Sequence, residues 1–250
     1  MLLLAFDTTT RVCTVALGDG DNIRAEYMLH IKRTHSRHLL PLIVSLLKDS
    51  GVDKDRLDGV VVSVGPGSFT GIRVGMATAK GLCLGLKIPV VRVMTLDALA
   101  GACAVFPGLI CPILDARRDQ VYTALYRGGT ADPQMLQPAA ALSCGKLVKM
   151  LGDYEEEVIF LGDAVKGFGK ELKLQLGEKR YKQAPLPSCF NRASLVLQRG
   201  VRIWREEGPL SPHALKPFYI RLPEAERKLQ EKNRKEKSKI AGKDHPHDDR

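Results

Sequence analysis

The segment DGVVVSVGPGSFTGIRVGMATAKGLCLGL at residues 58–86 predicts a strand, a glycine turn and a helix in direct succession. Residues 59–64 carry no charge and are mostly β-branched, which is typical of a strand buried on both faces of a mostly parallel sheet. The turn at residues 65–67 contains two glycines that tolerate positive φ and a proline whose φ is fixed. Ser68 or Thr70 can cap the helix that follows. We therefore expect the fold to be built around this segment.

The predicted helix has two different faces. Apolar residues recur at positions 72, 76, 79, 83 and 86, which is the spacing of one helical stripe. A second stripe is almost free of side chains because it contains three glycines, and each glycine inside a helix costs roughly 1 kcal/mol relative to alanine. That cost indicates that another backbone or a ligand approaches this stripe closely.

Two interpretations of the glycine stripe stay open. In the first, the glycines only permit tight helix packing. In the second, the strand end, the turn and the helix N-terminus form an anion cradle. The residues that would contact a nucleotide there are Asp7, Thr8, Gly65, Gly67 and Gly71.

The residues before and after this segment extend the pattern. Residues 2–6, 12–17 and 23–29 predict strands, and a hairpin turn at residues 18–22 joins the last two. A helix begins near Thr34 or Ser36 and ends at Gly51. A strand at residues 89–93 and a helix at about residues 95–104 follow the central helix. The first part of the chain is therefore βββαβαβα, which is an α/β pattern.

The same pattern begins again after a boundary at residues 105–108. AFDTTTRVCTVAL at residues 5–17 resembles ILDARRDQVYTAL at residues 113–125, and the glycine turn at residues 162–167 resembles the central one. Helices are expected at residues 143–151 and 191–207. We expect two related halves that face each other across a cleft. Their limits are an N-terminal lobe at residues 1–106, a C-terminal lobe at residues 107–222 and a charged, disordered tail at residues 223–250.

Composition indicates a globular protein with a basic surface. The formal net charge of +10 over 250 residues is compatible with RNA nearby. No apolar run is long enough for a membrane span and the first residues do not resemble a signal peptide, so we expect a cytoplasmic protein without membrane contact. The six cysteines have no C-x-x-C spacing and lie mostly in apolar runs, which predicts buried, reduced thiols.

Other candidates for chemistry are weaker. His35 and His38 could hold a metal, but no carboxylate or cysteine lies at matched spacing, so we expect a solvated or interface pair and no metal. Asp7 and Asp115 could form an acid/base pair, yet their matching positions in the two halves make them hairpin-end residues first. We therefore expect no catalytic residue.

Five motifs resemble one protein family. They are FDTTT at residues 6–10, THSRHLLP at residues 34–41, SVGPGSFTGIRVGMATAKGL at residues 63–82, LDARRDQVY at residues 114–122 and PFYIR at residues 217–221. Over residues 1 to about 222 the sequence is similar to the TsaB family, formerly called YeaZ. The resemblance implies an actin-like, sugar-kinase-like fold of the ASKHA, ribonuclease H-like class, with two duplicated halves.

The resemblance also implies a non-catalytic role in making threonylcarbamoyladenosine (t6A) beside the anticodon of tRNA. The implied partners are the paralogue TsaD, which performs the transfer, the ATPase TsaE, and tRNA through the complex. No cofactor of its own is implied, although ATP or ADP could lie at the interface of the complex. Two features of the sequence agree with a non-catalytic role. Residues 93–99 lack the histidines of a catalytic paralogue's metal motif, and Thr9 and Arg117 stand where an actin-like ATPase needs glycine.

We expect the pairing surface on the helix near Ser36 and on the central helix, as a four-helix interface with the paralogue or, in its absence, with a second copy. The residues assigned to it are Ser36, Leu39, Ile43, Leu46, Ile72, Met76, Ala79, Lys80 and Cys83.

Two other functions stay open. One is an enzyme, either an actin-fold phosphotransferase or a metallopeptidase, and the other is a stand-alone nucleotide sensor.

Overall fold

A computed structural model of the chain describes residues 1–20, 22–30 and 34–221, so the predicted tail lies outside the described residues. The order predicted for the first half, βββαβαβα, is confirmed. The strands and helices are β1 (Leu2–Asp7), β2 (Val12–Asp19), β3 (Asn22–His30), α1 (Leu39–Asp49), β4 (Gly59–Ser63), α2 (Phe69–Leu86), β5 (Val90–Val93), α3 (Thr95–Ala100), β6 (Leu109–Asp115), β7 (Gln120–Arg127), β8 (Gln134–Ser143), α4 (Cys144–Leu151), β9 (Val158–Leu161), α5 (Val165–Leu176), β10 (Tyr181–Gln183) and α6 (Ala193–Glu206).

The two halves have the same sheet topology. The five-stranded sheets have the orders β3-β2-β1-β4-β5 and β8-β7-β6-β9-β10. In each sheet the first three strands of the half form an antiparallel meander, and the last two strands join in parallel. The duplication that the repeated motifs predict is therefore present in the strand order as well as in the sequence.

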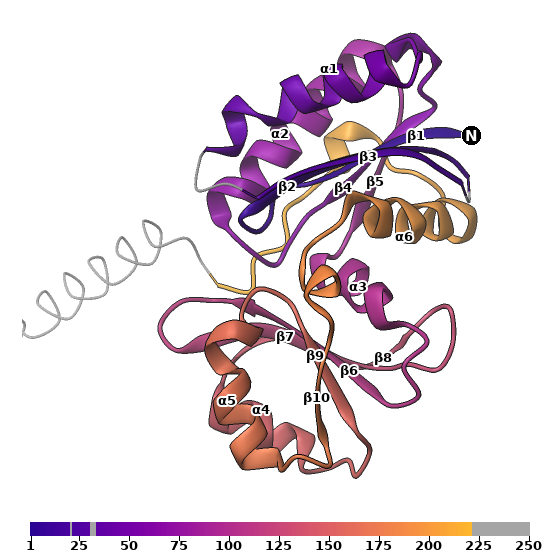
Figure 1. The fold of residues 1–250 in the computed structure, drawn as a ribbon. Coiled ribbons are helices and arrows are strands. Elements are labelled where there is room, and N and C mark those ends of the chain that lie inside the picture. Colours follow the sequence, from indigo (N-terminus) through magenta and orange to yellow (C-terminus); the bar gives the residue numbers. More distant parts are fainter. Residues whose placement is uncertain (21, 31–33, 222–250) are drawn as a thin grey trace, which may run out of the picture. The chain divides into compact units, whose positions relative to one another are not determined.

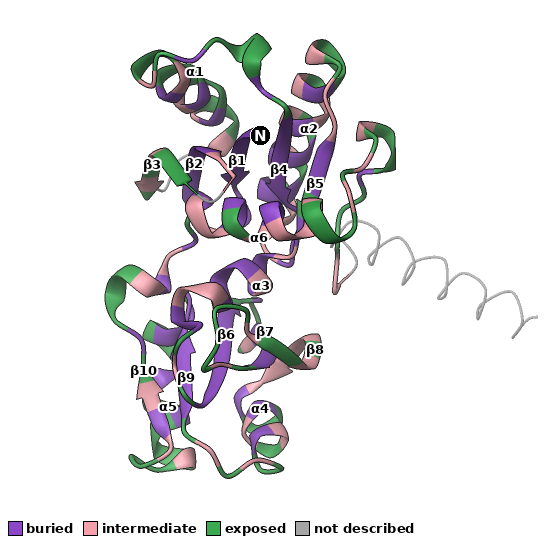
Figure 2. Cartoon of the chain, turned by 90° about the vertical axis from the view of Figure 1, so that its right-hand side faces the viewer, coloured by how far each residue is buried: buried purple, intermediate pink, exposed green. Residues whose placement is uncertain are grey.

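The central strand is buried as predicted, since every residue of β4 is enclosed. On one face of the first sheet, Phe6 and Val62 pack with residues of α1 and α2. On the other face, Val61 packs with Val196 and Leu197 of α6. Figure 1 shows these helices on the two sides of the sheet, and Figure 2 shows that the strands are mostly buried while exposed residues lie on the outer helices. Among the described residues, no helix has both the length and the apolar character to cross a membrane.

The last helix of each half packs against the sheet of the other half. Helix α3 contacts β6 and β7, whereas α6 contacts β1, β2 and β5. The sequence assigned α6 to the C-terminal lobe at residues 107–222, and the structure places it on the first sheet. Helical periodicity shows that a helix has an apolar face but not which sheet that face covers. Met1–Tyr219 consequently form one compact unit.

Candidate functional site

The glycine turn is filled by the chain's own backbone. The Ser68 side chain caps α2 by accepting a hydrogen bond from the Gly71 N–H at 3.3 Å, and the Ser68 N–H donates to the Thr9 carbonyl at 2.7 Å. A Cβ atom on Gly71 would collide with the carbonyl oxygen of Thr8, and one on Gly67 would collide with that of Thr9. The glycines thus let the end of β1 lie directly against α2, which confirms the tight-packing interpretation.

Four of the five predicted nucleotide contacts are buried, and Gly67 is partly buried. Asp7 and Thr8 are 0% and 2% exposed, Gly71 faces Thr8, and Gly65 faces the carbonyl of Phe218. The chain's own backbone lies against Gly65, Gly67 and Gly71, and the nucleotide contacts stay a prediction. The sequence signalled a close approach correctly, but the approaching group belongs to the chain itself.

Asp7 is the centre of a buried hydrogen-bond network. Its Oδ1 accepts from the N–H of Thr9 at 2.6 Å and from the Thr9 hydroxyl at 2.7 Å, and its Oδ2 accepts from Asn191 Nδ2 at 3.0 Å. The Thr95 hydroxyl donates to Thr9 Oγ1 at 3.2 Å. A buried carboxylate is tolerated when its oxygens are satisfied in this way. Asp7 therefore ties β1 to the segments that begin α3 and α6.

Asp115, the matching residue of the second half, has a different environment. It is exposed at the end of β6, where its carboxylate accepts the Arg117 N–H at 2.7 Å and lies 3.6 Å from the Arg117 guanidinium. Its own N–H donates to Asp163 Oδ1 at 3.0 Å. The two aspartates thus have different surroundings, since Asp7 is fully buried and bonded to Thr9 and Asn191, whereas Asp115 is exposed and bonded to Arg117.

Most of the predicted pairing surface is the chain's own core. Seven of the assigned side chains are at most 6% exposed and pack in the cluster under α1 and α2, namely Leu39, Ile43, Leu46, Ile72, Met76, Ala79 and Cys83. Their assignment to an interface is wrong, because an apolar stripe on a surface helix first covers its own sheet. Ser36 is exposed and Lys80 is partly exposed, so these two residues can still reach a partner.

The opposite faces of the same helices carry apolar side chains into solvent. Leu40 and Val44 on α1 are 51% and 63% exposed, and Leu84 on α2 is 51% exposed. Two turns before Leu84, Ala77 is exposed, and one turn before it a Cβ atom on Gly81 would meet nothing within 4 Å among the described residues. Exposed apolar side chains on one face of a helix are typical of interaction surfaces. We call Leu40, Val44, Ala77, Gly81 and Leu84 the outer helical face.

His30 and His35 contact other segments of the chain, and the cysteines are buried. His35 Nε2 lies 2.7 Å from the Thr10 carbonyl oxygen, and the His30 ring packs on Phe190. Within the described ranges, no group of three or more His, Cys, Asp or Glu side chains is placed to hold a metal ion. All six cysteines are buried and unpaired, as predicted. Burial raises the pKa of Cys83 and Cys103 to about 11, so both remain thiols at neutral pH.

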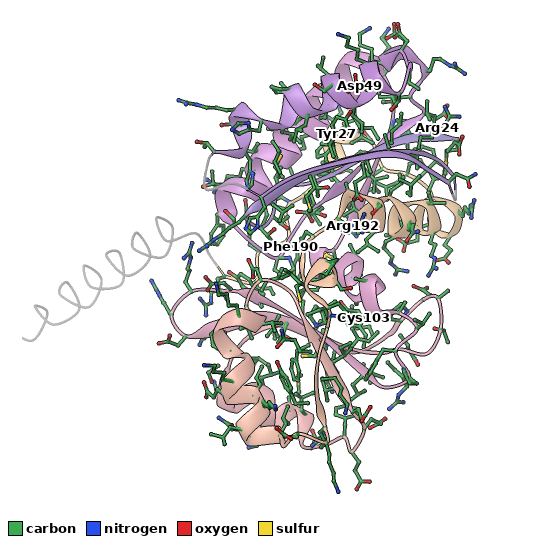
Figure 3. The ribbon with its side chains drawn as sticks, in the orientation of Figure 1. Arg24, Tyr27, Asp49, Cys103, Phe190 and Arg192 are labelled. Atoms are coloured by element: carbon green, nitrogen blue, oxygen red, sulfur yellow. The ribbon has the colours of Figure 1, made fainter. Side chains whose placement is uncertain are left out.

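A cleft of about 500 Å³ lies between the two sheets. Its lining comes from the β1–β2 turn, the end of β3, the start of α5 and the linker before α6, and includes Arg11, His30, Asp163, Lys166, Leu186 and Phe190. Figure 3 shows Phe190 between the first and second sheets. Desolvation in the cleft raises the pKa of Asp163, and the positive charges of Arg11 and Arg117 oppose that rise.

Several residues of this region have no signal in the sequence. Phe190 and Asn191 lie in an irregular linker, and Asn191 reaches Asp7 from 184 positions away. Glu26 is one polar residue on an edge strand, yet it binds Arg192 and Ser194 at the start of α6. Local patterns cannot identify such residues, because their partners are set only by the packing of α6 on the first sheet.

The duplicated sheets and their exchanged helices define an α/β protein of the actin-like, two-lobed class. A solved structure from Pseudomonas aeruginosa, described as an uncharacterized protein with similarity to peptidase YEAZ, matches with a TM-score of 0.76 and 26% identity, over 88% of this chain and 99% of that chain. The activator of a 2-hydroxyisocaproyl-CoA dehydratase from Clostridium difficile shares the fold alone, with a TM-score of 0.51 and 9% identity, over 87% and 99% of the two chains.

Sequence comparison gives the family. The family model described as "TsaD: tRNA N6-adenosine threonylcarbamoyltransferase" matches residues 23–176. The Bacillus subtilis protein named tRNA threonylcarbamoyladenosine biosynthesis protein TsaB is 34% identical over 228 residues, which are 91% of this chain and 97% of that protein. The Escherichia coli protein of the same name is 36% identical over 51% of this chain and 55% of its own length. The chain belongs to the TsaB (YeaZ) family, and the family and fold expected from its motifs are confirmed.

Proposed function

We propose that this chain is a non-catalytic subunit of the machinery that makes t6A on tRNA, and that it acts by pairing with a TsaD-like paralogue. The relatives named above are t6A biosynthesis proteins, which supports the pathway. The observation that carries the pairing is the outer helical face, where Leu40, Val44 and Leu84 are all more than half exposed. Burying these side chains against a partner would remove apolar area from water.

The closed turn after β4 supports the non-catalytic part of the proposal. A phosphate-binding turn needs backbone N–H groups that a ligand can approach. Here the Gly71 and Ser68 N–H groups already donate to the Ser68 hydroxyl and the Thr9 carbonyl, and the Asp7 carboxylate accepts from Thr9 and Asn191.

The form of the pairing follows from the shared fold. The model for the TsaD family covers both α1 and α2 of this chain, so a TsaD-like paralogue has corresponding helices to pack against them. The result would be a four-helix interface, with small Ala77 and Gly81 allowing close approach. A second copy of this chain would take the same place when the paralogue is absent. A TsaE-like ATPase and tRNA would join through the complex in the cytoplasm, and ATP or ADP would lie at the complex interface.

The experiment is co-purification of the chain with the TsaD-like protein of the same organism, followed by a tRNA modification assay. Val44→Asp and Leu84→Asp should each weaken pairing at least tenfold and reduce t6A formation, with an unchanged melting temperature. Leu174→Asp is the matched control, because Leu174 is 85% exposed on α5, outside the outer helical face. It should leave pairing and modification unchanged.

Three results would contradict the proposal. Retained pairing in both Asp variants would remove the outer helical face as the contact. ATP hydrolysis by the isolated chain would favour a phosphotransferase, and a stoichiometric metal would favour a metallopeptidase. Modification that proceeds fully without this chain would exclude a required subunit.

A further inference from the structure

Three cationic side chains surround the cleft between the sheets. Arg11 lies in the β1–β2 turn, Arg117 in the β6–β7 turn and Lys166 at the start of α5, and all three residues are exposed. Arg11 and Lys166 line the cleft directly, and Arg117 is close enough to Asp163 to influence its charge. Lys166 makes no hydrogen bond or ion pair with another described residue. We call Arg11, Arg117 and Lys166 the cleft rim.

The β6–β7 turn holds its arginines in an unfavourable backbone conformation. Arg117, Arg118 and Asp119 have φ angles of 62°, 55° and 53°, which is the left-handed region that residues with a Cβ avoid. Glycine at these positions would relieve the strain, yet the turn keeps long charged side chains. Strain of this kind often accompanies functional positions.

The carboxylates of the cleft accept hydrogen bonds from the backbone of the β6–β7 hairpin. Asp163 Oδ1 accepts the Asp115 N–H at 3.0 Å, and Asp115 Oδ1 accepts the Arg117 N–H at 2.7 Å. These bonds hold the hairpin while the Arg117 side chain remains 77% exposed. Three cationic side chains and the two carboxylates of Asp115 and Asp163 thus lie together at the cleft, and both carboxylates already accept backbone hydrogen bonds.

The lining of the cleft also includes apolar and aromatic side chains. The rings of Phe190 and His30 have centroids 5.2 Å apart and planes inclined by 58°, and Leu186 is 70% exposed beside Phe190 in the lining. A cleft of about 500 Å³ is within the size range of sites for one small organic group. An aromatic wall behind a cationic rim suits a planar base that is attached to phosphate.

We propose that this cleft binds one unpaired nucleotide of an RNA loop, with its phosphates on the cleft rim and its base against Phe190. The inference rests on the proposed function, because a tRNA is the substrate there. An unpaired loop is favoured over a duplex, since an A-form helix hides its base edges and faces. A free nucleotide also has a base and phosphates, so the experiment must distinguish an RNA loop from a free nucleotide.

The test uses the full chain, alone and paired with the TsaD-like protein, in fluorescence anisotropy with three probes: a labelled anticodon stem-loop, its stem as a closed duplex, and a fluorescent ATP analogue. The double variant Arg11→Glu, Lys166→Glu should raise the Kd for the stem-loop at least tenfold and flatten its salt dependence. The control Lys146→Glu, Lys149→Glu changes the net charge equally at exposed positions of α4 and should change the Kd less than threefold. Phe190→Ala should weaken stem-loop binding without changing the salt dependence.

Arg117→Gly separates binding from folding. It relieves the left-handed backbone strain, so the melting temperature should rise or stay constant while stem-loop affinity falls.

An equal loss of stem-loop affinity in the rim and α4 variants would overturn the proposal, as would tighter binding of the duplex than of the stem-loop. Binding of the ATP analogue without the stem-loop would assign the cleft to free nucleotides instead. Pairing is followed on the same samples. If the chain without substitutions pairs but does not bind the stem-loop, this inference alone is contradicted; if it binds the stem-loop but does not pair, the proposed function alone is contradicted.

Discussion

At Gly71, helix α2 and the end of β1 are in contact through their backbones. The Thr8 hydroxyl donates to the Gly71 carbonyl at 2.7 Å, and the Thr8 carbonyl occupies the position that a Cβ atom on Gly71 would need. Gly81, ten residues later on the same helix, has open space around the corresponding position. Replacement by alanine should therefore have opposite effects on stability at these two glycines of one helix.

We expect Gly71→Ala to lower the free energy of unfolding by about 1–3 kcal/mol, since the added methyl group forces the backbones apart. Gly81→Ala should raise it by up to about 1 kcal/mol, because alanine favours an exposed helix interior. Urea unfolding of the isolated chain, followed by Trp204 fluorescence, measures both. The same sign for the two variants would contradict the packing that we assign to Gly71.

The sequence predicts a close approach at Gly71 but not the approaching group. The cost of glycine in a helix is a local signal, whereas Thr8 lies 63 positions away. Met76 illustrates the same limit, since periodicity predicts that it is buried but does not say whether its own sheet or a partner covers it. In the structure its own sheet does, at 6% exposure. Burial can be predicted from a local pattern, whereas the burying surface depends on the whole fold.

At the scale of elements, helix α6 begins with a cap from another part of the chain. Its N-cap residue, Arg192, provides no side-chain hydrogen bond to the helix. Glu26 of β3 accepts instead from the Ser194 N–H and from the Ser194 hydroxyl, both at 2.9 Å, and it also accepts from Arg192 Nε at 3.1 Å. The Glu26 side chain is only 12% exposed. Figure 3 shows Arg192 below the first sheet. A carboxylate at this end of a helix also interacts favourably with the helix dipole.

We expect Glu26→Ala to destabilise the chain by about 1–2 kcal/mol, which is the usual loss when an N-cap is removed. Glu206→Ala removes the same side chain at the opposite end of α6, where a negative charge opposes the dipole, so it should be neutral or slightly stabilising. Thermal unfolding gives the stability, and hydrogen exchange of the first α6 amides shows whether the loss begins there. Equal effects at both ends would exclude capping as the cause.

Elements with strong periodicity are predicted well, and elements formed by pairing are not. The strands and helices through α3 follow from apolar runs and glycine turns in the sequence. No local pattern assigns β8 (Gln134–Ser143), whose sequence has a proline and three alanines and therefore low strand propensity. It forms because its backbone pairs with β7 at the edge of the second sheet. An edge position also explains why Pro138 is tolerated there.

At the scale of the whole molecule, the exchange of α3 and α6 ties the two sheets together. The Tyr126 hydroxyl of β7 donates to Asp97 of α3 at 2.6 Å. Arg199 of α6 donates to Asp132 in the β7–β8 turn at 3.1 Å, and Arg202 donates to the Ala131 carbonyl at 2.8 Å. These contacts join a helix that covers the first sheet to the hairpin of the second. The lobe limits predicted at residues 106 and 107 therefore fall inside one compact unit rather than between two independent ones.

This connection predicts a single unfolding transition for Met1–Tyr219. Trp204 packs with the face of the first sheet that α6 covers, so its fluorescence reports on that sheet, while hydrogen exchange of β6 and β9 peptides reports on the second. We expect both probes to have the same urea midpoint. Asp132→Ala should lower both midpoints together by roughly 1 kcal/mol or less, because its ion pairs are half exposed. Asp153→Ala, an exposed control, should change neither. If the second sheet unfolds at lower urea than Trp204 reports, residues 1–106 and 107–222 behave as separate domains, and the exchanged helices do not couple them.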